Sequence, residues 1–329
     1  MTPLCRLSRQ SSPVAADLLG RVLMHEHIFV ILPRCSKTIP RSGVMKMLGS
    51  PTPSPSSTNF YDAGISTILD PTAIGLGRYI PRIQRVASET KINIVAATGH
   101  YTFNELPHYY RGRPPEGRDI LLTQFVRDIT DGIAETTVKA GVIKCATDKP
   151  GVTPDVERVL LAAAHAHRET GCPITTHTHA RTERGADQMA IFQSQGVDMT
   201  RVVIGHCGDT DDLDYLSRLA DSGAYLGMDR FGIDGYATTE QRVAVIASLC
   251  ERGYADQLVL SHDGSCYIDW IQGEVPLGAL PNWHYLHISR DVIPMLLAVG
   301  VSEADVDKML VAPAHVSSSA PPAWVATGG

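Results

Sequence analysis

Two histidines one residue apart, His25 and His27, are the first residues in this chain whose types and spacing suggest chemistry. They lie within an apolar run, residues 21–30, that is typical of a β-strand. Because side chains alternate between the two faces of a strand, both imidazoles point to the same side. Imidazole is the commonest protein ligand for zinc and related metals, so the pair could form half of a metal site. The same spacing also occurs among ordinary surface and core histidines.

Further ligand-type side chains stand at or near the C-terminal ends of other apolar runs. They are Lys144, His177 with His179, His206 and Asp263. Taken singly, each has an ordinary structural explanation: Lys144 as a surface lysine, His206 as a core histidine and Asp263 as a helix cap. These separate explanations do not account well for so many ligand-type residues at the ends of apolar runs in one chain. If the runs are parallel strands of one barrel, their ends meet at a single face, where barrel active sites form.

The combined set favours two metal ions over one. Four imidazoles, one aspartate and one lysine exceed what a tetrahedral zinc ion accepts, whereas two ions can share a hydroxide. The ammonium form of Lys144 cannot be a ligand. Burial near two cations would remove its proton, and the neutral amine can add carbon dioxide to give a carbamate whose two oxygens bridge the metals. Lys144 is therefore the central residue of this hypothesis.

The elements that must position these residues are short runs rich in β-branched residues, mostly followed by amphipathic stretches of helical length. The predicted strands are residues 22–30, 64–70, 92–98, 140–146, 173–179, 201–207, 224–230 and 257–263. The predicted helices are residues 77–89, 119–139, 153–169, 183–195, 211–222, 238–252 and 288–312. This alternation indicates an α/β fold, and eight units fit a single (β/α)8 TIM-barrel domain over residues 1–329. The main alternative is an open doubly wound sheet, although no GxGxxG follows the first strand.

Composition narrows the class of partner. With 43% hydrophobic and 19% charged residues the chain is an ordinary globular protein. A net charge of −6 without a basic run argues against nucleic-acid binding, so we expect a small-molecule partner. We also expect a cytoplasmic protein without a membrane partner, because there is no membrane-length apolar stretch and no signal-peptide pattern. The seven scattered cysteines do not suggest a disulfide framework, and Cys145, Cys172 and Cys207 are expected to be small buried hydrophobes.

Read together, the motifs resemble the phosphotriesterase family of the amidohydrolase superfamily, most closely its phosphotriesterase-like lactonases. The matching segments are LMHEH (23–27), DPT (70–72) leading into GLGR (75–78), ATG (97–99) with Tyr101, GVIK (141–144), THTH (176–179), IGHCGDT (204–210), GMDRFG (227–232) and LSHD (260–263). The similarity runs over residues 20–32 and 60–311.

The resemblance implies a distorted barrel with a binuclear metal centre at the C-terminal face. The implied ligands are His25, His27 and Asp263 for the more buried ion, His177 and His206 for the more exposed ion, and N6-carboxylated Lys144 as the bridge. Zinc is the expected metal, and iron, cobalt or manganese would suit the same nitrogen and oxygen donors. His179 is not a ligand in the family pattern, and we consider it a candidate for supporting the ligands.

The resemblance also implies a mechanism. A hydroxide between the ions attacks, the exposed ion polarises the substrate carbonyl or phosphoryl oxygen, and Asp263 takes the proton. Tyr101 would hydrogen-bond the substrate or the bridging oxygen, and Arg230 would lie beside the leaving-group pocket. The simpler explanations are a packing residue at the barrel rim for Tyr101 and a surface cation for Arg230. Residues 264–284 are predicted to form an aromatic-bearing loop that lines a groove for an acyl tail.

The function that we expect is a lactonase that opens N-acyl homoserine lactones and related lactones, and hence quorum quenching, with organophosphate triesterase activity as a side reaction. One alternative reverses the order and makes the protein mainly a phosphotriesterase, or aryldialkylphosphatase. The other is a catalytically silent barrel. By family analogy we expect a homodimer.

Two segments depart from the family pattern. Residues 34–58 contain four prolines and no apolar periodicity, so they cannot form the helix expected after the first strand. The resemblance also stops at residues 312–329. We interpret both segments as out-of-frame readings of the family's coding sequence, which the nucleotide sequence can test.

Overall fold

The computed structural model describes residues 3–7, 13–15, 19–31, 61–113, 117–268 and 280–311. Residues 34–58 and 312–329 lie outside the described residues, so the out-of-frame interpretation stays a prediction.

Eight parallel strands form the centre of the fold, at the positions that the β-branched runs predicted. Each strand pairs with the next in chain order. The strands are β3 (Arg21–Leu23), β5 (Ile65–Asp70), β6 (Asn93–Gly99), β7 (Val142–Thr147), β8 (Ile174–Thr178), β9 (Val202–Ile204), β10 (Tyr225–Met228) and β11 (Leu258–Leu260). Nearly every residue of these strands is buried, which explains why they read as continuous apolar runs.

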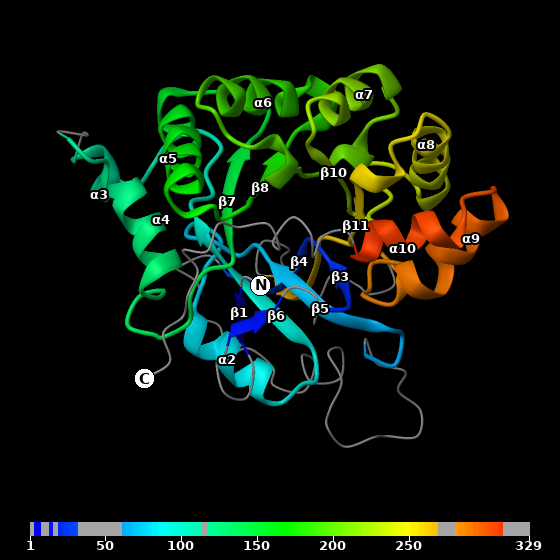
Figure 1. The fold of residues 1–329 in the computed structure, drawn as a ribbon, viewed down its shortest axis with the longest axis horizontal. Coiled ribbons are helices and arrows are strands. Elements are labelled where there is room, and N and C mark those ends of the chain that lie inside the picture. Colours follow the sequence, from blue (N-terminus) through cyan, green and yellow to red (C-terminus); the bar gives the residue numbers. More distant parts are fainter. Residues whose placement is uncertain are drawn as a thin grey trace.

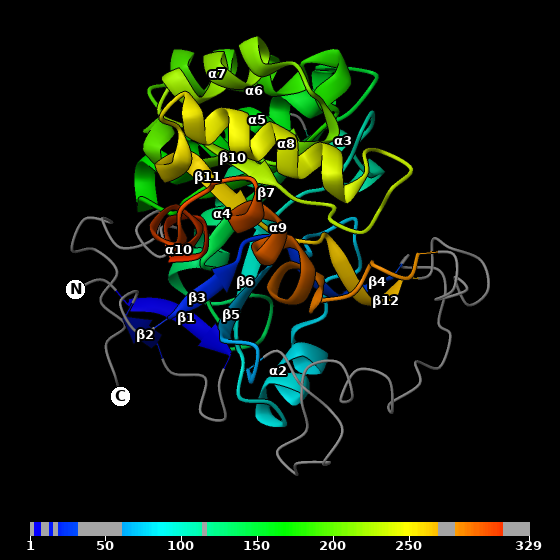
Figure 2. The same ribbon diagram turned by 90° about the vertical axis from the view of Figure 1, so that its right-hand side faces the viewer.

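A second pair of strands joins the first strand to the last. β4 (Glu26–Val30) continues from β3, β12 (Gly264–Ile268) continues from β11, and the two run parallel with Glu26 opposite Gly264. They lie side by side in Figure 2. Because this pairing closes the barrel, the open doubly wound alternative is wrong. The prediction of a loop over residues 264–284 is also wrong for its first five residues, since backbone pairing with β4 makes them a strand.

The barrel is distorted near β6. β1 (Pro3–Leu7) pairs antiparallel with Ile94 and Val95 of β6, and β2 (Pro13–Ala15) pairs antiparallel with β1. β7 contacts only the other half of β6, from Ala97 to Gly99. The family resemblance implied a distorted barrel, and the antiparallel pairing of β1 with β6 is one distortion that the structure contains.

Helices surround the strands, with α4 to α8 forming an arc around one side of the sheet in Figure 1. The helices are α2 (Ile80–Ser88), α3 (His108–Arg111), α4 (Ile120–Thr130), α5 (Pro154–Thr170), α6 (Arg184–Ser194), α7 (Leu213–Asp221), α8 (Thr239–Glu251), α9 (Ile293–Ala298) and α10 (Glu303–Val311). Short 3-10 helices are η2 (Ala180–Thr182), η3 (Met199–Arg201), η4 (Cys207–Asp209) and η5 (Ala255–Gln257), and η6 (Ile288–Val292) is a short π-helix. No described helix is long and apolar enough to cross a membrane.

Two predicted helices are shorter than expected. The helix predicted over 119–139 ends at Thr130, because Gly132 adopts a φ of +142° that a helix cannot continue. The helix predicted over 288–312 is divided into η6, α9 and α10, with Gly300 at a φ of +95° between the last two.

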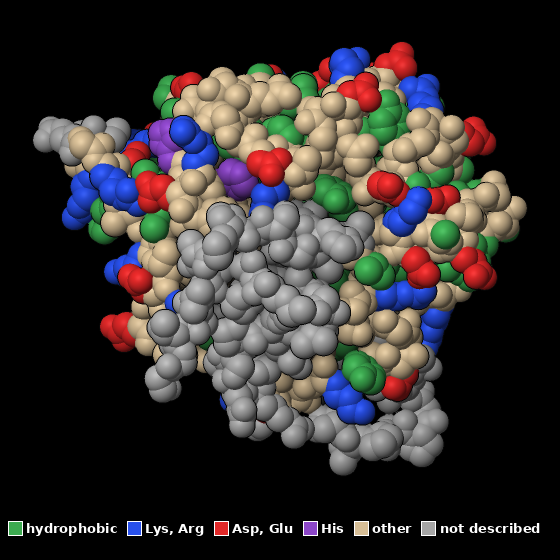
Figure 3. Space-filling view, viewed as in Figure 1, with side chains coloured by type: hydrophobic (Ala, Val, Ile, Leu, Met, Phe, Trp, Pro, Cys, Tyr) green, Lys and Arg blue, Asp and Glu red, His purple; other side chains and the backbone are tan. Residues whose placement is uncertain are grey.

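Apolar side chains fill the barrel below its C-terminal face. One buried cluster includes Val142, which precedes Lys144 by two residues on β7. Even spacing along a strand puts these two side chains on one face, so the cluster lies under Lys144. Among the described cysteines, Cys145, Cys172 and Cys207 are free and fully buried, as expected. At the surface, Figure 3 shows acidic and basic side chains interspersed on the face in view.

Candidate metal centre

The C-terminal ends of the strands bring all six expected ligands together. His25 and His27 flank the start of β4, Lys144 lies on β7 and His177 lies on β8. His206 comes two residues after β9, and Asp263 comes three residues after β11. The lysine and the four histidines are buried, and the Asp263 side chain keeps 17% exposure. His206 and Asp263 have φ values of 60° and 51°, in the left-handed region, which turns their side chains from the strand ends into the site.

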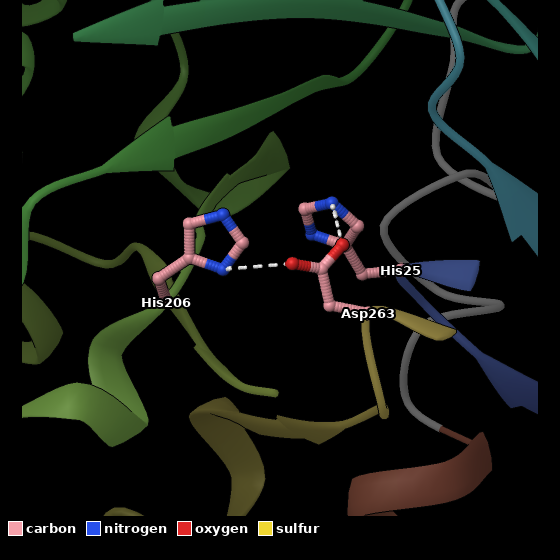
Figure 4. Close-up of side chains that lie close together, drawn as sticks. All are labelled: His25, His206 and Asp263. Carbon is pink, nitrogen blue, oxygen red and sulfur yellow. Dashed lines mark ion pairs between the residues drawn. The ribbon is translucent and has the colours of Figure 1, made fainter. Parts of the chain in front are cut away.

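Asp263 connects the two halves of this cluster. Its Oδ1 lies 3.4 Å from His25 Nε2 and 3.3 Å from His27 Nε2. Its Oδ2 lies 4.0 Å from His206 Nδ1, and Figure 4 shows the carboxylate between the rings of His25 and His206. Lys144 Nζ stands 3.4 Å from His25 Nε2 and donates to the Thr176 carbonyl at 3.1 Å.

The other half consists of two facing imidazoles and a phenol. His206 Nε2 lies 2.8 Å from His177 Nδ1. The hydroxyl of Tyr101 lies 3.3 Å from the same His177 nitrogen, with the two rings edge to face. Tyr101 is therefore close to the ligand cluster, as the resemblance implied.

Carboxylates behind the histidines were not assigned from the sequence. Asp229 faces His206 Nδ1 at 2.7 Å and His25 Nδ1 at 3.3 Å, so one buried side chain contacts a histidine in each half. Asp148 faces His177 Nε2 at 2.6 Å. Asp229 lies near the end of the predicted strand 224–230 and Asp148 lies two residues after the predicted strand 140–146. Their positions made them candidates, but the sequence does not show which histidine nitrogen each one faces.

His27 has a similar partner. Its Nδ1 lies 2.8 Å from Thr72 Oγ1 and 3.6 Å from Asp70 Oδ1. Asp70 also accepts a hydrogen bond from the Thr72 backbone N–H at 3.0 Å, which fixes the carboxylate at the end of β5. Burial alone would lower the pKa of His27, but hydrogen bonds to Asp263 and Asp70 outweigh it and raise the pKa to about 9.

The facing pair of imidazoles shows that this donor set fits a metal ion. The outer nitrogens of His206 and His177 face Asp229 and Asp148 and so carry the protons, which leaves lone pairs on the two inner nitrogens 2.8 Å apart. Such lone pairs repel unless a proton or a cation neutralises them. Burial disfavours the proton, because it lowers the pKa of His177 to about 4 and that of His206 well below its ordinary value. Imidazoles with nearby carboxylates suit zinc, iron, cobalt or manganese.

Lys144 is held in an environment that favours its neutral form. Burial lowers the pKa of its amine to about 8, although Asp263 and Asp229 oppose the shift. The backbone of β6 approaches Lys144 closely at Gly99, whose φ is +111°, and a Cβ there would lie 1.9 Å from the Lys144 carbonyl oxygen. Only glycine permits this contact.

Arg230 is a largely buried cation, with 12% of its side chain exposed, and not the surface residue of the simpler explanation. Its Nε donates to Asp263 Oδ2 at 3.1 Å and one terminal nitrogen donates to Asp209 Oδ2 at 2.6 Å, while the guanidinium stacks over Tyr236. Arg242 donates to the other oxygen of Asp209 at 2.8 Å. Burial would lower the pKa of Arg230, but Asp263 and Asp209 raise it, so Arg230 stays charged.

A cavity of about 340 Å³ opens beyond this network, lined among others by Arg181, Asp209, Tyr236 and Gln241. Asp209 and Tyr236 also contact Arg230, so the wall of the cavity adjoins this network.

His179 and the pair His284 and His287 lie outside the ligand cluster. His179 is half-buried and its Nδ1 contacts Thr182 Oγ1 at 2.8 Å, which places it in the turn after β8. His287 engages both ring nitrogens, with Asp291 at 2.8 Å and with Thr239 at 2.9 Å. The contact with Thr239 connects the start of the last helical region to α8, and the His284 ring packs edge-on against His287.

The predicted acyl groove is described only in part. Residues 269–279, which include Trp270, lie outside the described residues. Trp283 donates from its indole to the His262 carbonyl at 3.2 Å, beside Asp263. The groove therefore stays a prediction.

Comparisons with known proteins identify the family of this chain. The chain matches the model of the phosphotriesterase family over residues 6–315. It is 49% identical over 318 residues to a phosphotriesterase homology protein of Mycobacterium tuberculosis, covering 93% of this chain and 95% of that protein. A solved phosphotriesterase from M. tuberculosis has a TM-score of 0.89 at 47% identity, covering 95% of this chain and 98% of that chain.

A further solved structure comes from the molecular engineering of organophosphate hydrolysis activity from a weak promiscuous lactonase template. It superposes with a TM-score of 0.80 at 32% identity, covering 96% of this chain and 100% of that chain. With the family model matching almost the whole chain and the barrel matching solved relatives, this protein belongs to the phosphotriesterase family of hydrolases.

Proposed function

We propose that this hydrolase opens lactones, N-acyl homoserine lactones in particular, at a centre of two divalent metal ions. His25, His27 and Asp263 would hold one ion, His177 and His206 the other, and Lys144 would bridge them as its N6-carboxylate. The observation that carries the proposal is the pair of opposed inner nitrogens of His177 and His206, 2.8 Å apart, whose lone pairs a cation would neutralise and whose protonation burial disfavours. Two ions of this kind, zinc by preference, would supply hydroxide at neutral pH and would polarise the carbonyl or phosphoryl oxygen of the substrate.

The protein's own contribution begins with Lys144. A pKa of about 8 leaves an appreciable fraction of the amine neutral at neutral pH, and a neutral amine can add carbon dioxide with loss of a proton. The Thr176 carbonyl, which accepts from Nζ at 3.1 Å, orients the nitrogen for that addition.

Asp263 is placed to move a proton during hydrolysis. Its carboxylate is partly exposed at the mouth of the site, whereas the histidines around it are buried. Burial alone would raise its pKa, but His25, His27 and Arg230 outweigh that effect and keep it ionised, ready to accept a proton and pass it to the leaving group. Arg230 fixes the second carboxylate oxygen at 3.1 Å.

Tyr101 supplies a hydrogen-bond donor at the same mouth. Burial raises its pKa well above the ordinary value, so the hydroxyl keeps its proton at neutral pH. A neutral phenol 3.3 Å from a ligand nitrogen can donate to the oxygen of a bound substrate, which assists attack on an ester carbonyl.

The preference for lactones over phosphotriesters is supported by the motifs shared with the lactonase branch and by the likeness to a structure engineered from a lactonase template. The test compares kcat/KM for a long-chain N-acyl homoserine lactone and for paraoxon on one zinc-loaded preparation. A higher value for the lactone is expected. A large preference for paraoxon would favour the alternative, a phosphotriesterase, which the M. tuberculosis relatives' names support.

Metal analysis separates both enzymes from a silent barrel. We expect close to two ions per chain after purification with zinc, and fewer than about one would overturn the two-ion proposal. We also propose a homodimer that acts on a small molecule and has neither a nucleic-acid nor a membrane partner. Light scattering after gel filtration tests the dimer.

A further inference from the structure

Glu26 stands between the two ligand histidines of the first strand, and its side chain points away from them. It is completely buried. A buried carboxylate needs several donors to offset the loss of water. Glu26 has four donors. Its Oε1 accepts from the Ser261 hydroxyl, the His262 backbone N–H and the His262 ring Nδ1. Its Oε2 accepts from the Gly264 N–H at 2.9 Å.

These contacts enclose Asp263 on both sides. The His262 N–H, at 2.8 Å, belongs to the residue before Asp263, and the Gly264 N–H belongs to the residue after it. Asp263 itself adopts a φ of 51°, in the left-handed region, which aspartate enters more readily than most residues but which still costs energy relative to glycine. The Glu26 carboxylate contacts both flanking peptides and so stabilises this turn from outside.

The same cluster also reaches the histidines of the first strand. Ser261 Oγ accepts from the His25 N–H at 2.7 Å and donates to Glu26 at 3.1 Å. On the outer side, His262 Nε2 accepts from the Ile288 N–H at 3.0 Å, which leaves the proton on Nδ1, directed at Glu26 at 2.7 Å.

We propose that Glu26 is a positioning residue that sets Asp263 against His25 and His27 before any ion binds. The inference rests on the metal centre proposed above. A carboxylate is required, because an amide in its place has a single acceptor oxygen and would turn its own N–H groups towards the Gly264 N–H or the His262 donors.

The test compares Glu26→Gln with Asp128→Asn. Asp128 is an equally buried carboxylate on α4 that pairs with Arg78 at 2.9 Å and accepts from Thr98, away from the ligands. Two measurements are made on each protein: hydrogen exchange of the metal-free form, followed in the peptide covering residues 258–268, and Zn²⁺ affinity at each site by competition with a chromophoric chelator.

Glu26→Gln is expected to speed exchange in residues 258–268 while leaving the β7 peptide protected. It should weaken one of the two Zn²⁺ sites by roughly 10- to 100-fold, the effect typical of removing a group that orients a metal ligand, and leave the other site unchanged. Excess Zn²⁺ should restore activity. Asp128→Asn should lower Tm without changing either affinity.

Unchanged affinities and unchanged exchange in a folded Glu26→Gln protein would overturn the proposal, and so would equal weakening of both sites with exchange raised throughout. If Glu26→Gln does not fold, Glu26→Asp keeps the charge but is too short to span both peptides, and it should show the same pattern. Wild-type protein that binds no Zn²⁺ would refute the proposed metal centre, while the exchange measurement would still decide whether Glu26 holds the Asp263 turn.

Discussion

Asp229→Asn is the substitution that most directly tests how the histidines are oriented. The wild-type carboxylate accepts three hydrogen bonds: Oδ1 from His206 Nδ1 at 2.7 Å, and Oδ2 from the His206 backbone N–H at 3.0 Å and from His25 Nδ1 at 3.3 Å. Asparagine has one acceptor oxygen. In one orientation it keeps the bond to His206 Nδ1 and loses His25, and in the other it keeps His25 and loses His206 Nδ1.

Either orientation costs one metal ligand its correct tautomer. The amide N–H₂ would donate to the histidine nitrogen that it faces, which moves that ring's proton to the inner nitrogen and removes the lone pair needed for the ion. A hydrogen bond to a charged group contributes about 1.5–3 kcal/mol, which equals roughly 10- to 100-fold in affinity. We therefore expect at least one Zn²⁺ site to weaken by that factor.

The assay is chelator competition, with zinc content measured in parallel and with Asp128→Asn as the buried-carboxylate control. Circular dichroism and a thermal melt establish that the variant is folded. The reasoning is refuted if a folded Asp229→Asn protein binds both ions with wild-type affinity, because the histidines would then not depend on this carboxylate for their tautomers.

Three other outcomes are expected. Lys144→Ala should lower zinc content and reduce kcat/KM by at least about 100-fold, since the two ions lose their shared ligand; full activity would contradict the bridging role. Gly99→Ala should lower the free energy of unfolding by about 2–4 kcal/mol in urea titrations, because its Cβ would collide with the Lys144 carbonyl; wild-type stability would show that β6 can shift. His100 is 2% exposed, and burial lowers its pKa to about 4, so the folded state resists its protonation. Its contribution to the free energy of unfolding is present above pH 6.5 and is lost as pH falls towards 4, by about 3 kcal/mol at most. His100 packs against Tyr110, so phenylalanine can take its place, and His100→Phe should make the free energy of unfolding less dependent on pH over that range. An unchanged pH profile would refute this.

The strands and the ligand cluster were predictable for one physical reason. Strands buried on both faces read as apolar runs, and in a barrel the residue that ends such a run faces the site. Lys144 and His206 both followed from that rule, before any family was considered. The resemblance then distributed them between two ions.

The residues that support the ligands were harder to predict from the sequence, because the role of each depends on which histidine nitrogen or backbone N–H it faces. Glu26 was visible inside the first motif, but only the pairing of the first and last strands shows that it contacts the turn at Asp263. The role of Asp229 could be recognised only from the orientations of the His25 and His206 rings, which direct one nitrogen each at its carboxylate. The breaks at Gly132 and Gly300 were missed because amphipathic spacing continued past them, although both glycines adopt positive φ values that end a helix.

The pairing of β4 with β12 has a consequence for how the protein matures. His25 and Asp263 come from opposite ends of the described sequence and are joined by a backbone hydrogen bond of 3.1 Å across that pairing. Contacts between distant parts of a chain form late, because a long loop must close first. A chain still emerging from the ribosome would thus carry the first two histidines without their aspartate, and could not complete the site until its last strand docked. An ion bound by residues from both strands would stabilise the closed barrel, and bound metal would therefore indicate that the first and last strands had paired.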